Sequence, residues 1–151
     1  MKSKRLLLAI FHLSFFIFLA GCVGQSAEVK PPEIVYNEDI CEACGMLISE
    51  ARFASATVDV DGTPHKFDDI GDLVDYYASH SAAQVKAYFV HDYTSQQWIR
   101  AETATFIVSP KIMTPMMHGI AAFADKSAAE AMAQQLGVKV LDFAQLKAAK
   151  P

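Results

Sequence analysis

The segment that decides the fold is Arg52-Phe53-Ala54-Ser55-Ala56-Thr57-Val58-Asp59-Val60. Apolar and polar residues alternate loosely along it, which predicts a half-buried β-strand. The next two residues, Asp61-Gly62, are typical of a type I′ hairpin turn, because both tolerate positive φ. A short return strand is then expected at His65-Lys66-Phe67, so the sequence predicts a β-hairpin over residues 52–67.

A helix and a third strand are expected after this hairpin. Between Asp69 and His80, apolar residues occupy positions 70, 73, 74 and 77, the spacing of an amphipathic helix. Asp68 or Asp69 is expected to cap the helix, because a carboxylate there accepts free backbone N–H groups and suits the helix dipole. Lys86–Val90 predicts a strand, which completes a β-β-α-β unit.

The second half of the chain repeats this order of elements. The predicted elements are strands at Ala104–Val108 and Gly119–Phe123, a helix opened by the capping-box pattern Ser127-Ala128-Ala129-Glu130 and ended by Leu136-Gly137, a strand at Val138–Leu141, and a terminal helix within Asp142–Lys150. The helices are also preceded by similar residues, Phe67-Asp68-Asp69 and Phe123-Ala124-Asp125. We therefore predict an α+β fold of two small β-β-α-β units, residues 33–100 and 101–151. Duplication explains this order better than two unrelated hairpin–helix pieces.

The N-terminus has the pattern of an exported lipoprotein. Lys2, Lys4 and Arg5 precede an apolar run from Leu6 to Leu19, as in a secretory signal peptide over residues 1–21. Leu19-Ala20-Gly21-Cys22 resembles the lipobox of bacterial lipoproteins, in which the cysteine is acylated and the signal is cut before it. An ordinary signal peptide with a chance cysteine, or an uncleaved anchor helix, are the alternatives.

This pattern predicts a lipid anchor on Cys22, a flexible tether over residues 22–32 and a folded domain outside the cytoplasm. The periplasmic face of the membrane is the expected location. Val23, in place of an aspartate after the lipidated cysteine, favours the outer membrane over the inner one.

The charge of the chain excludes several classes of partner. The formal net charge is −4, and removal of residues 1–21, which carry three basic and no acidic residues, changes it to −7. A nucleic-acid-binding protein or a polybasic membrane-surface patch would be basic instead. No run after residue 21 approaches the roughly 18 apolar residues of a membrane span.

The residues best suited to chemistry are two sulfur-rich segments. Cys41-Glu42-Ala43-Cys44-Gly45-Met46 can chelate one ion, because a turn brings both thiols to the same side and Gly45 permits tight backbone. Met113-Thr114-Pro115-Met116-Met117-His118-Gly119 adds thioethers and an imidazole. Thiolate and thioether are soft ligands, which select Cu(I). Among the histidines, His118 stands out because it neighbours Met116 and Met117.

Other chemistry stays open on the isolated Cys-x-x-Cys motif. A structural disulfide, a redox dithiol and half of a zinc site all fit it. The chain lacks a second Cys or Cys/His pair at zinc-ligand spacing, and haem attachment would need a histidine where Gly45 stands. Asp92 could orient the imidazole of His91, but no nucleophile is placed with this pair.

Several spaced motifs together resemble the NosL-type copper lipoproteins, accessory proteins of nitrous oxide reductase. They are Cys41–Ile48, Phe67-Asp68-Asp69-Ile70-Gly71-Asp72-Leu73, Tyr88–Tyr93, Thr114-Pro115-Met116 and Gly119–Ala124, in the family's order and behind a lipobox. The resemblance implies two β-β-α-β units. It also implies a protein that binds Cu(I) in the periplasm and delivers it for assembly of the reductase's copper centres.

The resemblance also implies ligands. Carried over by position, Cys44 and Met116 are the strongest candidates, while Met46 belongs to the same motif and Cys41 is a second thiolate. Met117 and His118 are added by their proximity to Met116. We thus expect a membrane-anchored metallochaperone rather than an enzyme, with nitrous oxide reductase or its assembly machinery as partner. The alternatives are a lipid-anchored thiol–disulfide protein that uses Cys41 and Cys44, and an interaction module with a structural disulfide.

Overall fold

The structure, a computed structural model, describes residues 28–149. The predicted signal peptide, Cys22 and the first part of the predicted tether lie outside these residues. Within residues 28–149, none of the helices combines the length and the apolar character that a membrane crossing requires.

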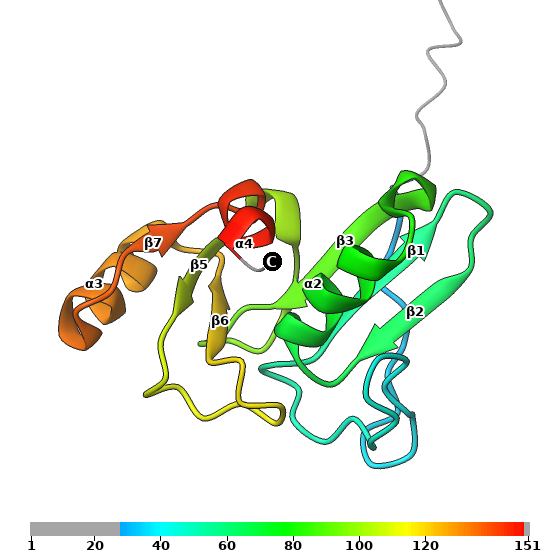
Figure 1. The fold of residues 1–151 in the computed structure, drawn as a ribbon, viewed down its shortest axis with the longest axis horizontal. Coiled ribbons are helices and arrows are strands. Elements are labelled where there is room, and N and C mark those ends of the chain that lie inside the picture. Colours follow the sequence, from blue (N-terminus) through cyan, green and yellow to red (C-terminus); the bar gives the residue numbers. More distant parts are fainter. Residues whose placement is uncertain (1–27, 150–151) are drawn as a thin grey trace, which may run out of the picture.

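The first unit is a four-stranded antiparallel sheet with one helix (Figure 1). Its elements are β1 (Ser55–Asp59), β2 (Pro64–Phe67), α2 (Ile70–Ser79), β3 (Val85–His91) and β4 (Trp98–Arg100). The strand order is β2-β1-β3-β4, so the first strand of the hairpin lies between its partner and the strand that follows the helix. Of the two predicted caps, Asp68 and Asp69, it is Asp69 that forms the N-cap of α2, and its side chain accepts a hydrogen bond from the Gly71 N–H.

The β1–β2 hairpin is confirmed, but its predicted turn type is wrong. The connection is residues 60–63, and of the two predicted turn residues only Gly62 has positive φ. A type I′ turn needs positive φ at both central residues. Asp61 instead accepts a hydrogen bond from the Thr63 N–H, an Asx turn that competes with the two-residue hairpin.

The second unit repeats the topology of the first. Its elements are β5 (Thr105–Val108), β6 (Ile120–Phe123), α3 (Lys126–Leu136), β7 (Val140–Leu141) and α4 (Phe143–Ala149). The strand order β6-β5-β7 again places the first strand in the centre. This confirms the α+β fold with two β-β-α-β units.

Two details of the second half differ from the prediction. Helix α3 begins before the predicted capping box, because the side chain of Asp125 already accepts the Ser127 N–H and makes Asp125 the N-cap. Strand β4 was not predicted. It is three residues long and adds to the edge of β3 through register pairs such as His91 with Trp98, which a pattern of apolar residues does not reveal.

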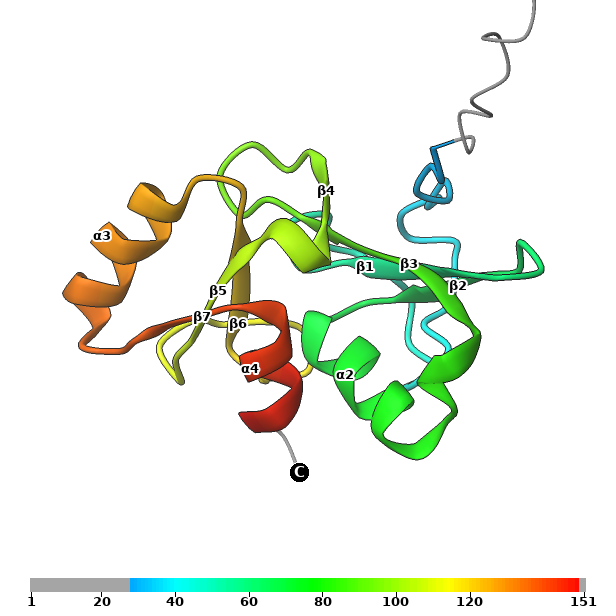
Figure 2. The same cartoon turned by 90° about the horizontal axis from the view of Figure 1, so that it is seen from above.

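The two units share a hydrophobic core and are joined by backbone. Phe106 and Ile120 of the second unit, together with Phe143 and Leu146 of α4, belong to the same buried cluster as Leu73 of α2. Figure 2 shows α2 and α4 on the same side of the sheets, with α3 at the far end of the second unit. A parallel bridge between Asp92 and Ala122 connects β3 to β6.

Asp92 and His91 do not form the pair that the sequence suggested. The Asp92 carboxylate accepts hydrogen bonds from the Ser95 and Ala124 N–H groups, so it closes a turn and ties the units together. The His91 ring is buried, with Nδ1 3.0 Å from the Ala54 carbonyl oxygen and Nε2 3.3 Å from the Tyr36 hydroxyl. His91 is therefore a core histidine whose two ring nitrogens both have partners.

Candidate metal centre

The Cys-x-x-Cys segment forms a tight loop before β1. Ile40 and Leu47 pair as an antiparallel bridge, and the Cys41 N–H donates to the Met46 carbonyl at 2.8 Å. The Gly45 N–H donates back to the Cys41 carbonyl at 2.9 Å, and Gly45 has φ +75°. Glycine adopts this left-handed backbone without a steric cost. The loop thus folds both cysteines to one side, as the sequence suggested.

The two thiols meet a carboxylate that the sequence analysis did not select. Cys41 Sγ lies 3.2 Å from Oδ2 of Asp72, in the first turn of α2. The Sγ atoms of Cys41 and Cys44 and a carboxylate oxygen of Asp72 all lie within 4.8 Å of one another. Cys41 and Asp72 are buried, Cys44 is half-buried, and both cysteines are free thiols. Among residues 28–149, this is the group of cysteine, histidine and acidic side chains close enough to hold a metal ion.

The environment keeps the metal-free Cys44 thiol protonated. Burial raises its pKa to about 12, and the neighbouring Cys41 and Asp72 act in the same direction. The pKa of Asp68, which precedes the helix cap, is also raised by burial and by the nearby Asp72 and Asp69 carboxylates. Negative charge is therefore crowded and poorly solvated here, a setting in which a bound cation would be stabilised.

The methionine-rich loop is fastened to the same end of α2 by Asp69. One Asp69 oxygen caps the helix, while Oδ2 accepts the Thr114 hydroxyl at 2.5 Å and the Met116 N–H at 3.2 Å. The Thr114 hydroxyl oxygen in turn accepts the Gly119 N–H at 3.2 Å. Because Asp69 and Thr114 are buried, this network fixes the loop between β5 and β6 against the helix.

His118 completes the connection between the two sulfur-rich segments. Its Nε2 lies 3.2 Å from Oδ1 of Asp72 and 3.6 Å from Oδ2 of Asp75. The ring also lies directly against Gly71, where an added Cβ would be only 2.1 Å from His118 Cγ. One carboxylate therefore contacts Cys41 through one oxygen and His118 through the other. Figure 1 shows the loops around residues 45 and 115 at the same end of the molecule.

The predicted site residues take different positions in this arrangement. Cys41, Cys44 and His118 are gathered around Asp72, and Met116 is half-buried with its backbone held by Asp69. Met46 and Met117 are more open, with 46% and 63% of their surface exposed. The group around Asp72 is therefore largely buried, whereas Met46 and Met117 are exposed to solvent.

Three positions that complete the site were missed as site residues: Asp69, Gly71 and Asp72. All three lie in the stretch Phe67–Leu73, which the sequence analysis used only to recognise a helix start and a family resemblance. The three-residue spacing of Asp69 and Asp72 could have identified both carboxylates. A helix cap at 69 places residue 72 in the first turn, so both carboxylates point to the same end of the helix.

Comparison with known proteins identifies the family of the chain. A family model described as NosL matches residues 32–150 of the chain. The chain belongs to the NosL family. Among solved structures, the crystal structure of the copper chaperone NosL from Shewanella denitrificans matches with a TM-score of 0.67 and 25% sequence identity. The match covers 78% of this chain and 96% of that chain. None of the curated proteins compared with this NosL-family chain matches it significantly.

Proposed function

We propose that this NosL-family chain is a copper chaperone that binds Cu(I) and hands it to a partner protein. The observation that carries the proposal is the convergence of the Cys41–Cys44 loop and the loop holding Met116 and His118 on the first turn of α2. The similar protein from Shewanella denitrificans is described as a copper chaperone, which supports the same function. The role is binding and transfer, not catalysis.

The proposed ligands are the soft donors of the two loops. Cys44 and Met116 are the primary pair, with Cys41 as the second thiolate and His118 as the nitrogen donor. Thiolate and thioether favour Cu(I) over hard divalent ions. Met46 and Met117, which are exposed, would be the first groups that an arriving or departing ion meets.

Loading exchanges a proton for the metal ion. With its pKa raised to about 12, Cys44 carries a proton at neutral pH, so Cu(I) binding forms the Cu–S bond and releases that proton to water. Asp72 accepts the Cys41 thiol at 3.2 Å and contacts His118 at the same distance, which orients both donors before the ion arrives. The chain thus supplies a preorganised site whose affinity increases with pH.

Release follows from the position of the site at a loop edge. A Cu(I) ion with few ligands can accept a sulfur or imidazole from a partner before it loses one of its own. Its ligands come from two loops, so the partner can displace the exposed thioethers first and the buried thiolates last. This order favours transfer on contact over loss of free ion.

The cellular setting of the proposal rests on the N-terminal pattern and on the family resemblance. Lipidation of Cys22 would hold the domain at the periplasmic face of the membrane, with the outer membrane favoured by Val23. The proposed recipient is nitrous oxide reductase, or the machinery that assembles its copper centres. The acidic net charge of residues 22–151 supports a partner other than nucleic acid.

Competition for Cu(I) tests the site. We expect Cys44→Ser and Met116→Ala each to weaken Cu(I) binding by about two orders of magnitude, since each removes a metal ligand. Met113→Ala is the matched control, because Met113 lies in the same loop, with 65% of its surface exposed, and is not a proposed ligand. The measurement is anaerobic titration against a chromophoric Cu(I) chelator under reducing conditions. Unchanged competition in both ligand variants would exclude the site.

The thiol–disulfide alternative makes different demands on the same cysteines. Redox-active thiols have lowered pKa values, whereas burial raises that of Cys44 to about 12. A redox protein would also not need Met116. Thiol counting with and without Cu(I) separates the chaperone from the remaining alternative, an interaction module with a structural disulfide. Copper should protect both thiols of a chaperone, whereas a Cys41–Cys44 disulfide would leave neither thiol to count.

A further inference from the structure

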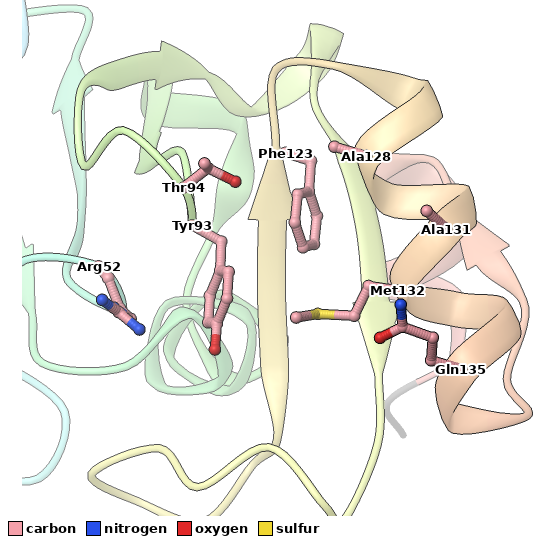
Figure 3. A pocket seen from close by; sticks show the side chains of 8 residues that line it. All are labelled: Arg52, Tyr93, Thr94, Phe123, Ala128, Ala131, Met132 and Gln135. Atoms are coloured by element: carbon pink, nitrogen blue, oxygen red, sulfur yellow. The ribbon is translucent and has the colours of Figure 1, made fainter.

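A pocket lies between the two units, lined by residues of the first unit and by β6 and α3 of the second unit. It has a volume of about 470 Å³, within the range of small-molecule sites. Figure 3 shows its two walls, with Tyr93 between Arg52 on one side and Phe123 and Met132 on the other. Ala131 and Gln135 line the pocket from α3. None of these residues belongs to the candidate metal centre.

The charged wall carries an arginine that forms no salt bridge within residues 28–149. Arg52 is half-buried, and its guanidinium carbon lies 4.9 Å from the centroid of the Tyr93 ring. Glu50 lines an adjoining hollow with it but is not within ion-pair distance. An arginine that is partly withdrawn from water gains from an anion that can approach its N–H groups.

A second arginine of the same protein, Arg100, has the carboxylate partner that Arg52 lacks among residues 28–149. Arg100 also stacks on an aromatic ring, with its guanidinium 5.2 Å from the Phe89 centroid. It is then completed by Glu102, whose carboxylate accepts from Nε at 3.1 Å and from Nη2 at 2.9 Å. The arginine–aromatic arrangement therefore occurs twice, and in one copy the carboxylate comes from the chain itself. At Arg52 the place of that carboxylate is open to a ligand.

The side of the pocket formed by β6 and α3 favours an apolar ligand group. Phe123, Met132 and Ala131 present an apolar surface, and Figure 3 shows the Met132 thioether directed toward the Tyr93 ring. A flexible thioether adapts to apolar groups of different shape. The amide of Gln135 and the hydroxyl of Thr94 add polar groups at the margin. A cation thus lies on one side of the Tyr93 ring, and an apolar surface lies on the other side.

The charge of the whole chain decides between a small ligand and an acidic protein surface. Residues 22–151 carry a formal net charge of −7, which repels an extended acidic partner but costs a singly charged molecule little. We propose that this pocket binds a small amphiphilic monocarboxylate, with its carboxylate on the Arg52 guanidinium and its apolar chain reaching past the Tyr93 ring to Phe123 and Met132. The site is separate from the proposed copper function and does not depend on it.

Octanoate is a suitable probe, tested by equilibrium dialysis of the isotope-labelled acid against the full-length chain in lipid nanodiscs. Nanodiscs without protein give the background for partition into lipid. We expect saturable binding of one octanoate per chain, weakened about ten- to hundredfold by Arg52→Met, which keeps the apolar stem but removes the charge. Arg100→Met is the matched control and should leave octanoate binding unchanged, because Arg100 already pairs with Glu102 of the same chain.

Two further arms make the test decisive. Ala131→Trp places a large ring in the pocket from an exposed helix position, so it should abolish binding while thermal unfolding stays cooperative. Octanol, which lacks the carboxylate, and acetate, which lacks the apolar chain, should both bind far more weakly than octanoate. Equal binding of octanol and octanoate, unchanged binding in Arg52→Met, or no saturable binding of octanoate would overturn the proposal.

Discussion

The two units share a topology, but their helix starts serve different purposes. Asp69 and Asp125 are both N-caps, and each accepts the N–H two residues further along at 2.8 Å. Asp125 is exposed, and both of its carboxylate oxygens also accept from the Ser127 hydroxyl. Asp69 is fully buried and also holds Thr114 and the Met116 backbone. The same local motif is a simple cap in one unit and the anchor of the candidate metal centre in the other.

The two hairpins differ in the length of the connection between their strands, and here the second unit has the larger role. In the first unit, residues 60–63 connect β1 to β2, whereas in the second unit residues 109–119 connect β5 to β6. The longer connection has room for Met116 and His118, and it reaches across to the helix of the first unit. The first unit therefore provides the thiols, the carboxylates and the Met46 thioether, and the second unit provides the loop with Met116, Met117 and His118. A repeated fold thus builds one site from its differences.

Substitution of the two N-cap aspartates should give the largest difference between the units in stability and in Cu(I) binding. Asp69→Ala loses a cap and two further hydrogen bonds to a buried carboxylate, so we expect a loss of about 3–4 kcal/mol in the free energy of unfolding. Cu(I) binding should weaken with it, because the loop carrying Met116 is released. Asp125→Ala should cost much less stability and leave Cu(I) binding unchanged. Urea unfolding and chelator competition measure both effects, and equal losses in the two variants would show that Asp69 is only a cap.

The residue two positions after each cap gives a second, smaller contrast. Gly71→Ala would place a methyl group 2.1 Å from His118 Cγ, so the imidazole must move away from Asp72. We expect overpacking to cost about 1–3 kcal/mol. Cu(I) binding should weaken through the loss of His118. Ser127→Ala, at the matching position of α3, should leave Cu(I) binding intact. The position of the His118 resonances in NMR spectra reports the displacement, and an unmoved ring in Gly71→Ala would contradict the packing argument.

The last strands of the two units differ in one titratable residue, and this difference should have the smallest effect. Strand β3 ends at the buried His91, whereas β7 ends at Leu141, which does not titrate. Burial lowers the pKa of His91 below 6.5, against the opposing effect of its hydrogen bond to Ala54. The unfolded chain therefore binds this proton more readily than the folded one, and stability falls as the pH drops below about 6.5 toward the folded-state pKa.

The loss assigned to His91 is at most about 1.4 kcal/mol per pH unit. His91→Phe keeps an aromatic ring against Trp98, whose centroid lies 3.7 Å from that of His91, but it cannot titrate. Its unfolding free energy should thus change less between pH 7 and pH 5 than that of the unchanged chain. Urea unfolding at both pH values checks this. A steeper pH dependence in the variant would assign the acid sensitivity to other groups.

Local sequence predicted most of the fold because the elements are short and regular. The apolar spacing of Ile70, Leu73 and Val74 identified α2, and the order of elements predicted the two units. Errors arose where side chains override simple patterns, as at the Asp61 turn and at the α3 cap. Strand β4 was missed because three residues at a sheet edge are held by backbone pairing with β3 rather than by their own pattern.

The sequence by itself determined the donors available to the site: two thiols near one turn, and methionines with a histidine in one loop. Soft-ligand chemistry depends on residue type, which a sequence states directly. Only the tertiary structure decided that Asp69, Gly71 and Asp72 bring these segments together, and that Arg52 lies against Tyr93 without a carboxylate partner among residues 28–149, while Arg100 has Glu102. The physical reason is that burial and long-range contact give an aspartate, glycine or arginine its role, and these depend on which distant segments pack against it.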